Sequence, residues 1–140
     1  MLQTELEYDR WLEQQIELLR QGKFEHLDAE NLIEELEALG RAEKSAVKSL
    51  VYQIILHLLL IDYWKEESEY SKNHWLAEVD AFQLQLEDKL TTNLAQLAED
   101  NLPRLYAKAR QNAIRKSRLP EERFPDSCPY TLELLKSVED

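Results

Sequence analysis

Hydrophobic residues recur every three or four positions across residues 28–64, which is typical of one face of an α-helix. The stripe consists of Leu32, Leu36, Leu39, Val47, Leu50, Ile54, Leu58 and Ile61. Asp28 can cap the N-terminus of this helix. Gly40 falls inside the stripe, and a glycine in a helix interior costs about 1 kcal/mol relative to alanine. The pattern therefore predicts a long helix with a break or kink at Gly40.

The same period predicts a helix on the N-terminal side of this stripe. It should begin at Thr4 or Asp9, either of which can cap it, and end at about Gln21. Gly22 stands where a glycine commonly ends a helix. A short connection then leads to the long helix.

Two more helices are expected after the long one. The polar stretch 65–73 reads as a loop, and Ser71 or Asn73 can cap a third helix that continues to about Leu90. Thr91-Thr92-Asn93 reads as a turn and a new cap, followed by a fourth apolar face over 94–113. Pro103 lacks a backbone donor, so this helix should kink or restart there.

The C-terminal part breaks the periodic pattern. Three of the four prolines follow Leu119, which predicts an irregular tail, with a short last helix expected after Tyr130 or Thr131. The chain has 140 residues, close to the usual size of one domain, and contains only two glycines. So few turn residues favour a few long helices over a sheet. We therefore expect an all-α fold, in which residues 1–140 form a single-domain bundle of four to five helices with a short irregular C-terminal tail.

Cysteine usage and the N-terminus bear on localisation. Cys128 is the single cysteine, so an intrachain disulfide is impossible and a reducing compartment is expected. The first nine residues have neither the basic nor the apolar part of a signal peptide. The longest apolar run, 54–61, is interrupted by His57 and is far shorter than the roughly 20 residues that cross a bilayer. These features predict a cytoplasmic protein with no membrane contact.

Charge is distributed unevenly along the chain. The net charge is −11, which on average repels nucleic acids and membrane surfaces. Residues 101–120, however, hold six Lys or Arg and no acidic residue. Four of these cations, Arg104, Lys108, Arg115 and Arg118, fall within an arc of about 80° on one helix face. This stripe is a candidate for binding nucleic acid or phosphate. The alternatives are a solvated face and pairing with acidic residues of this chain or a second copy.

His57 is the first candidate for chemistry, because it lies on the apolar stripe. It could act as a general base or metal ligand, or be a buried histidine with a hydrogen-bond partner from a neighbouring helix. Glu43 is roughly 21 Å from His57 along a straight helix, so the two side chains cannot share one metal ion within that helix. Di-metal bundles carry a glutamate three positions before each histidine. The residues at those positions are Lys23, Ile54 and Ser71. We therefore expect no metal and no cofactor.

Cys128 is the second candidate, as a nucleophile. A reactive cysteine needs a base or a cation beside it to stabilise the thiolate. The sequence cannot place His26, His57 or His74 beside Cys128, and a packed thiol that anchors the tail is the favoured interpretation. With glycine only at positions 22 and 40, the glycine-rich motifs of serine hydrolases, phosphate-binding loops and dinucleotide folds are excluded.

Three segments in order carry a resemblance to a known family. They are Asn31-Leu-Ile-Glu-Glu-Leu-Glu37 with Gly40-Arg41 and Glu43, then His57-Leu58-Leu59 with Trp75, then Phe124-Pro125 and Cys128-Pro129-Tyr130-Thr131-Leu132. Over roughly residues 8–135 the chain resembles the bacterial, largely cyanobacterial family numbered twenty-nine among the domains of unknown function.

The resemblance implies an all-helical, cytoplasmic bacterial protein without an established activity. It draws attention to Glu35, Glu43 and His57 as one polar cluster across two helices. The chain departs from the family pattern at Leu60-Ile61-Asp62, where a lysine is common, and at Thr91-Thr92-Asn93, where a serine-proline turn is common.

The first functional hypothesis is a non-enzymatic protein-interaction or regulatory module, self-associating or antitoxin-like, with a protein partner or a second copy as its ligand. An acidic surface and the lack of catalytic motifs favour it. The second hypothesis is nucleic-acid or phosphate binding through Arg104, Lys108, Arg115 and Arg118. The third is a metal-dependent hydrolase that uses His57 with Glu35 or Glu43.

Overall fold

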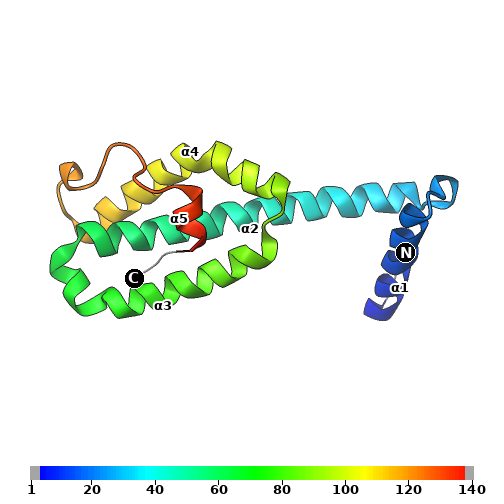
Figure 1. The fold of residues 1–140 in the computed structure, drawn as a ribbon, viewed down its shortest axis with the longest axis horizontal. Coiled ribbons are helices and arrows are strands. Elements are labelled where there is room, and N and C mark those ends of the chain that lie inside the picture. Colours follow the sequence, from blue (N-terminus) through cyan, green and yellow to red (C-terminus); the bar gives the residue numbers. More distant parts are fainter. Residues whose placement is uncertain (1–3, 138–140) are drawn as a thin grey trace. The chain divides into compact units, whose positions relative to one another are not determined.

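The computed structural model describes residues 4–137, and within that range the chain is helical with no strand. The elements are α1 (Glu5–Arg20), η1 (Phe24–His26), α2 (Ala29–Tyr63), α3 (Lys65–Lys89), α4 (Thr92–Ser117), η2 (Glu121–Arg123) and α5 (Leu132–Lys136). Figure 1 shows their order. The predicted all-α fold, with four long helices, a short fifth helix and an irregular tail, is confirmed.

Contacts divide the chain into two compact units, residues 1–41 and 42–140. The first unit holds α1, η1 and the beginning of α2. The second holds the rest of α2, all of α3 and α4, and the C-terminal tail. The single domain expected over 1–140 stays a prediction.

The expected break at Gly40 is wrong, because α2 runs without interruption from Ala29 to Tyr63. A side chain added at Gly40 would meet no atom within 4 Å, so no close packing requires a glycine there. Good helix formers such as Ala38, Ala42 and Lys44 surround the glycine. Their combined preference for the helix outweighs the penalty of about 1 kcal/mol for one glycine.

The loop expected over 65–73 is also wrong. Trp64 alone separates α2 from α3, which begins at Lys65. Most of the stretch faces solvent, although Ser68 is buried, and its Lys and Glu residues are good helix formers. Glu66 and Glu67 lie in the first turn of α3, where their negative charges interact favourably with the positive end of the helix dipole.

The fourth helix is confirmed with its predicted cap. The hydroxyl oxygen of Thr91 accepts a hydrogen bond from the Leu94 backbone N–H at 3.2 Å. Helix α4 then continues through Pro103, so the expected restart does not occur. The proline ring is exposed, which leaves the buried face of the helix intact.

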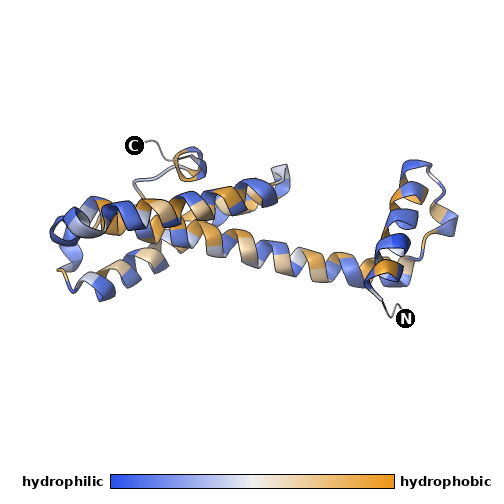
Figure 2. Cartoon of the chain, turned by 90° about the horizontal axis from the view of Figure 1, so that it is seen from below, coloured by the Kyte–Doolittle hydropathy of each residue, from blue (hydrophilic) through white to orange (hydrophobic). Residues whose placement is uncertain are grey.

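The core of the second unit forms around α2. Every residue from Ile54 to Ile61 is buried, because α3, α4 and the tail cover this helix from several sides. Figure 2 shows the apolar colour along these helices. By length and composition alone, α2 is apolar enough to cross a membrane, but 61% of its most apolar window is buried inside the fold. That burial is typical of a core helix.

The tail packs on the same core. Phe124 is 2% exposed and Leu135 is fully buried. The predicted short helix, α5, is confirmed after Thr131, whose hydroxyl oxygen accepts from the Leu134 N–H at 3.2 Å. Helix α5 contacts both α3 and α4. The amide nitrogen of Gln83 donates to the Leu135 carbonyl at 3.0 Å, which ties α5 to α3.

The first unit is a helical hairpin held mainly by polar bonds. Helix α1 begins at its predicted cap, Thr4, and ends before Gly22, which has a φ of +73°. The Trp11 indole N–H donates to an Asp28 carboxylate oxygen at 3.0 Å. Gln15, across the same turn, accepts from the Asp28 backbone N–H at 2.8 Å. In residues 4–41, Gln15 is the only buried side chain.

Candidate functional site

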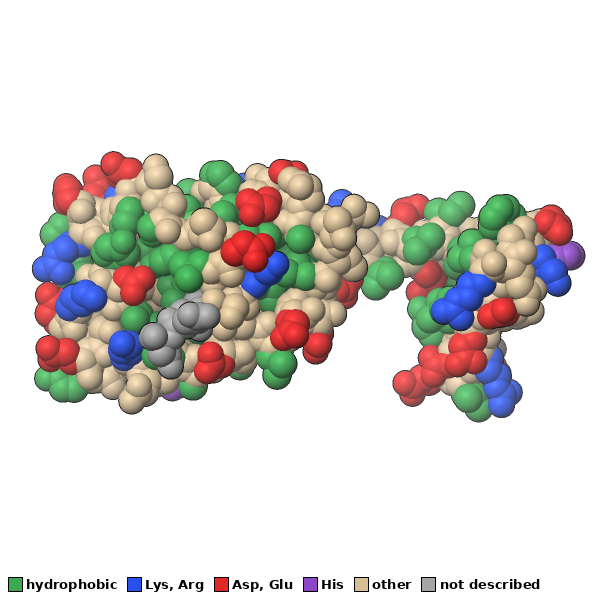
Figure 3. Space-filling view, in the orientation of Figure 1, with side chains coloured by type: hydrophobic (Ala, Val, Ile, Leu, Met, Phe, Trp, Pro, Cys, Tyr) green, Lys and Arg blue, Asp and Glu red, His purple; other side chains and the backbone are tan. Residues whose placement is uncertain are grey.

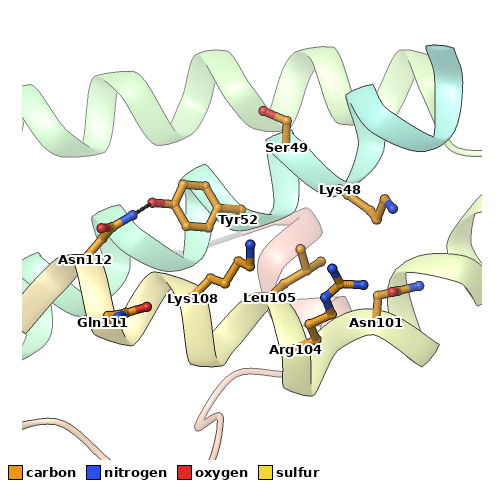
Figure 4. A pocket seen from close by; sticks show the side chains of 9 residues that line it. All are labelled: Lys48, Ser49, Tyr52, Asn101, Arg104, Leu105, Lys108, Gln111 and Asn112. Atoms are coloured by element: carbon orange, nitrogen blue, oxygen red, sulfur yellow. Dashed lines mark hydrogen bonds between the residues drawn. The ribbon is translucent and has the colours of Figure 1, made fainter. Parts of the chain in front are cut away.

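A polar pocket of about 400 Å³ lies between α2 and α4 in the second unit (Figure 4). Its lining residues from α2 are Lys48, Ser49 and Tyr52, and those from α4 are Asn101, Arg104, Leu105, Lys108, Gln111 and Asn112. The lining includes three cations and no acidic residue. It therefore has the composition of an anion site.

The pocket contains half of the basic stripe expected from the sequence. Arg104 and Lys108 line it, whereas Arg115 and Arg118 are exposed outside it. Helix α4 ends at Ser117 and Arg118 is its cap residue, so Arg118 does not belong to the helix face expected from the sequence. Lys48 is the third cation, and the sequence interpretation missed it. Lys48 is 56 positions before Arg104, and only the pairing of α2 with α4 brings the two to one pocket. The sequence signal that could have identified Lys48 is its i, i+4 spacing from Tyr52, beside the apolar stripe.

Some basic residues of the second unit have an acidic partner, and the pocket cations do not. Lys89 pairs with Glu43 at 3.4 Å, Arg123 with Glu66 at 3.4 Å and Arg110 with Asp126 at 3.5 Å. Within residues 4–137, Lys48, Arg104 and Lys108 form no ion pair. Their charges are therefore available to a ligand.

Two amide side chains of the pocket are held in place. The Asn112 amide nitrogen donates to the Tyr52 hydroxyl oxygen, which links α4 to α2. The Asn101 amide nitrogen donates to the Leu97 carbonyl at 2.8 Å. Because Tyr52 accepts a bond in this arrangement, its own hydroxyl proton can point to a ligand in the pocket.

His57 lies elsewhere in the second unit, on the side of α2 that faces α3. Its Nδ1 is 2.7 Å from the Gln53 carbonyl oxygen, and its Nε2 is 2.5 Å from a Glu78 carboxylate oxygen. The second oxygen of Glu78 is 3.2 Å from Nε2 of His74. The Phe82 ring meets the His57 ring edge-on, with centroids 5.4 Å apart. Each ring nitrogen of His57 thus has a partner, as a buried imidazole requires.

Replacing Glu78 with alanine should lower the free energy of unfolding by about 1–3 kcal/mol, because the buried His57 ring would lose its carboxylate partner. The His57 side chain is only 9% exposed, so water cannot fully replace Glu78. Urea unfolding followed by circular dichroism measures the change. Replacing the 72%-exposed His74 with alanine is the matched control, expected to change stability by less than about 0.5 kcal/mol. Equal losses in both variants would contradict the role of Glu78 as the partner of the buried His57 ring.

The structure does not bring Glu43 to His57. Glu43 pairs with Lys89, and the uninterrupted α2 places it roughly 21 Å from His57 along the helix axis. Glu35 belongs to the first unit, where it accepts a bond from the Tyr8 hydroxyl at 2.8 Å. The residues from 4 to 137 contain no group of three or more His, Cys, Asp or Glu side chains placed to hold a metal ion. A catalytic role for Glu35, Glu43 and His57 stays a prediction.

Cys128 lies half-buried in the tail, and its thiol donates to the Tyr130 carbonyl at 3.3 Å. Burial raises the pKa of the Cys128 thiol above its ordinary value. A raised pKa disfavours the thiolate that a nucleophile requires. These contacts favour the packing role over the reactive one.

Comparisons with known proteins give one result. No curated protein and no solved structure matches the chain. The family model described as domain of unknown function DUF29 matches residues 5–138, which is nearly the whole sequence. With its all-helical fold and its three ordered motifs, the chain belongs to the DUF29 family.

Proposed function

We propose that the protein is a non-enzymatic interaction module whose first unit binds a partner protein through the uncovered apolar faces of its helices. The observation that carries this proposal is the exposure of large hydrophobic side chains. Seven of the ten that are exposed in residues 4–137 belong to the first unit. They are Leu6, Ile16, Leu19, Phe24, Ile33, Leu36 and Leu39.

These side chains are grouped, not scattered. Ile33, Leu36 and Leu39 are three residues apart on α2 and are 56–62% exposed. That spacing places them along one side of the helix, as in an amphipathic face that packs on another helix. Hydrophobic side chains of the first unit reach the surface in Figure 3. Fully burying one such side chain is worth about 1.5–3 kcal/mol, so the face favours a protein partner that covers it.

Charge indicates what kind of partner fits. Residues 1–41 hold four Lys or Arg against eleven Asp or Glu. A second copy would bring the same excess of negative charge to the interface, and like charges at an interface oppose association. A different protein with an amphipathic helix, apolar on one side and flanked by Lys or Arg, complements both the apolar face and the charge. We therefore assign the face to a basic helical partner.

Site-specific photo-crosslinking in the source organism tests this assignment. A benzoylphenylalanine at Leu36 is expected to crosslink the chain to one separate protein whose crosslinked segment is a basic amphipathic helix. Leu84, on α3, provides the matched control, because it is 64% exposed where Leu36 is 62% exposed. The probe at position 84 is expected to give no such product. Serine at both Ile33 and Leu39 should reduce the yield at position 36 by about tenfold or more.

Three outcomes contradict the proposal. Equal crosslinking from positions 36 and 84 would mean nonspecific contact. A product with twice the mass of the chain would assign the face to a second copy. A crosslink only within one chain, or none, would mean that the face needs no partner.

A further inference from the structure

The pocket between α2 and α4 is independent of the apolar face of the first unit. We infer that it binds a small phosphorylated molecule, with Lys48, Arg104 and Lys108 as the phosphate ligands. The inference rests on three observations: the unpaired cations, their placement on two facing helices, and the size of the pocket.

The charge argument starts from the protein as a whole. The chain has a net charge of −11 and 28 acidic residues, yet none of these acidic residues lines the pocket. Three cations that share one pocket without any acidic residue repel each other, and a bound anion relieves this repulsion.

The geometry fits a phosphate group. Arg104 and Lys108 are one turn apart on α4, and Figure 4 shows their side chains extending towards α2, which supplies Lys48 and Tyr52. A guanidinium group can donate two parallel hydrogen bonds to phosphate oxygens, and a lysine ammonium adds a point charge. The Tyr52 hydroxyl is positioned by Asn112. Cations from both helices can thus reach a single anion from two sides.

Size and surroundings favour a small molecule over nucleic acid. A volume of about 400 Å³ falls in the range of small-molecule sites. Leu105 contributes a nearly buried apolar wall, which suits the organic part of a phosphorylated compound. A nucleic-acid strand needs contacts to successive phosphates and aromatic side chains for its bases. Arg115 and Arg118 lie outside the pocket, and Tyr52 is its only aromatic residue.

Isothermal titration calorimetry on the full chain at constant ionic strength tests the inference. The probes are pyrophosphate, adenosine monophosphate, adenosine as the uncharged control, and a single-stranded oligonucleotide of about 20 nucleotides. The variant Arg104→Gln with Lys108→Gln removes two pocket cations. The variant Arg115→Gln with Lys116→Gln removes the same charge from exposed positions of the same helix outside the pocket. Lys48→Gln tests the opposite helix. Circular dichroism confirms that each variant is folded.

We expect saturable binding of at least one of the two phosphate compounds and none of adenosine. The α4 pocket variant should weaken binding by about a hundredfold and Lys48→Gln by about tenfold, as expected for charged hydrogen bonds. The Arg115 and Lys116 variant should weaken it less than about threefold. Failure of both phosphate compounds to bind at about 1 mM would overturn the inference. So would equal weakening by the pocket and control variants, or binding of the oligonucleotide alone.

Discussion

Replacing Phe124 with alanine should lower the free energy of unfolding of the second unit by about 3–5 kcal/mol. The ring is 2% exposed and lies 6.1 Å from the Tyr63 ring, centroid to centroid, so its removal leaves a cavity between the tail and α2. Single domains are stable by only about 5–15 kcal/mol, so this loss is a large fraction of the total. Urea unfolding at neutral pH gives the value.

Phe24 provides the control for this experiment. It carries the same side chain but is 64% exposed in the first unit, so alanine there should cost less than about 0.5 kcal/mol. A loss at Phe124 as small as that at Phe24 would mean that the tail does not pack on the core in solution. An intact fold with a mobile tail would then replace the arrangement in Figure 1.

Raising the pH from 10 to 11 should lower the free energy of unfolding by roughly 2 kcal/mol through two buried tyrosines. Burial raises the pKa of Tyr106 to about 12. Burial and the Asp62 carboxylate raise the pKa of Tyr130 even further. In the unfolded chain both phenols ionise near pH 10, so above that pH the unfolded state has lost protons that the folded state retains. The stability they provide is complete below pH 10 and, for Tyr106, is progressively lost up to about pH 12.

Phenylalanine variants separate this effect from other alkaline titrations. Tyr106→Phe and Tyr130→Phe should each reduce the loss between pH 10 and 11 by about 1 kcal/mol relative to wild type. Tyr130→Phe also removes a 2.8 Å hydrogen bond to Asp62, so the change with pH, not the absolute stability, is the quantity to compare. Tyr70→Phe is the control, because Tyr70 is 82% exposed. The stability of Tyr70→Phe should change with pH as that of the wild type does. If all three variants lost the same free energy of unfolding between pH 10 and 11, the assignment of the effect to Tyr106 and Tyr130 would be contradicted.

The helices could be predicted because their signals are local. Thr4, Thr91 and Thr131 each cap a helix through a bond to a backbone N–H three residues later. The three wrong boundaries share one cause. Gly40 and Pro103 are unfavourable for helix taken alone, and the stretch 65–73 is polar throughout, but neighbouring helix formers and tertiary packing outweigh these signals.

The candidate site could be predicted only where it lies on one helix. Arg104 and Lys108 share a face of α4, and a count of 100° per residue places them together. Lys48 and Glu78 were missed because their partners come from other helices. The His57–Glu78 contact depends on which residues of α3 lie beside which residues of α2. Because the sequence prediction started α3 several residues too late, it could not place Glu78 beside His57.

The packing of the tail has a consequence for synthesis of the protein on the ribosome. The core that surrounds α2 includes Phe124, Leu132 and Leu135, which are made some sixty or more residues after the end of that helix. Until residue 135 has left the exit tunnel, part of the most apolar helix in the chain has no cover. During that interval the nascent chain presents the kind of surface that chaperones bind. The interval between the emergence of α2 and the emergence of residue 135 is therefore the period in which the second unit is most exposed to aggregation.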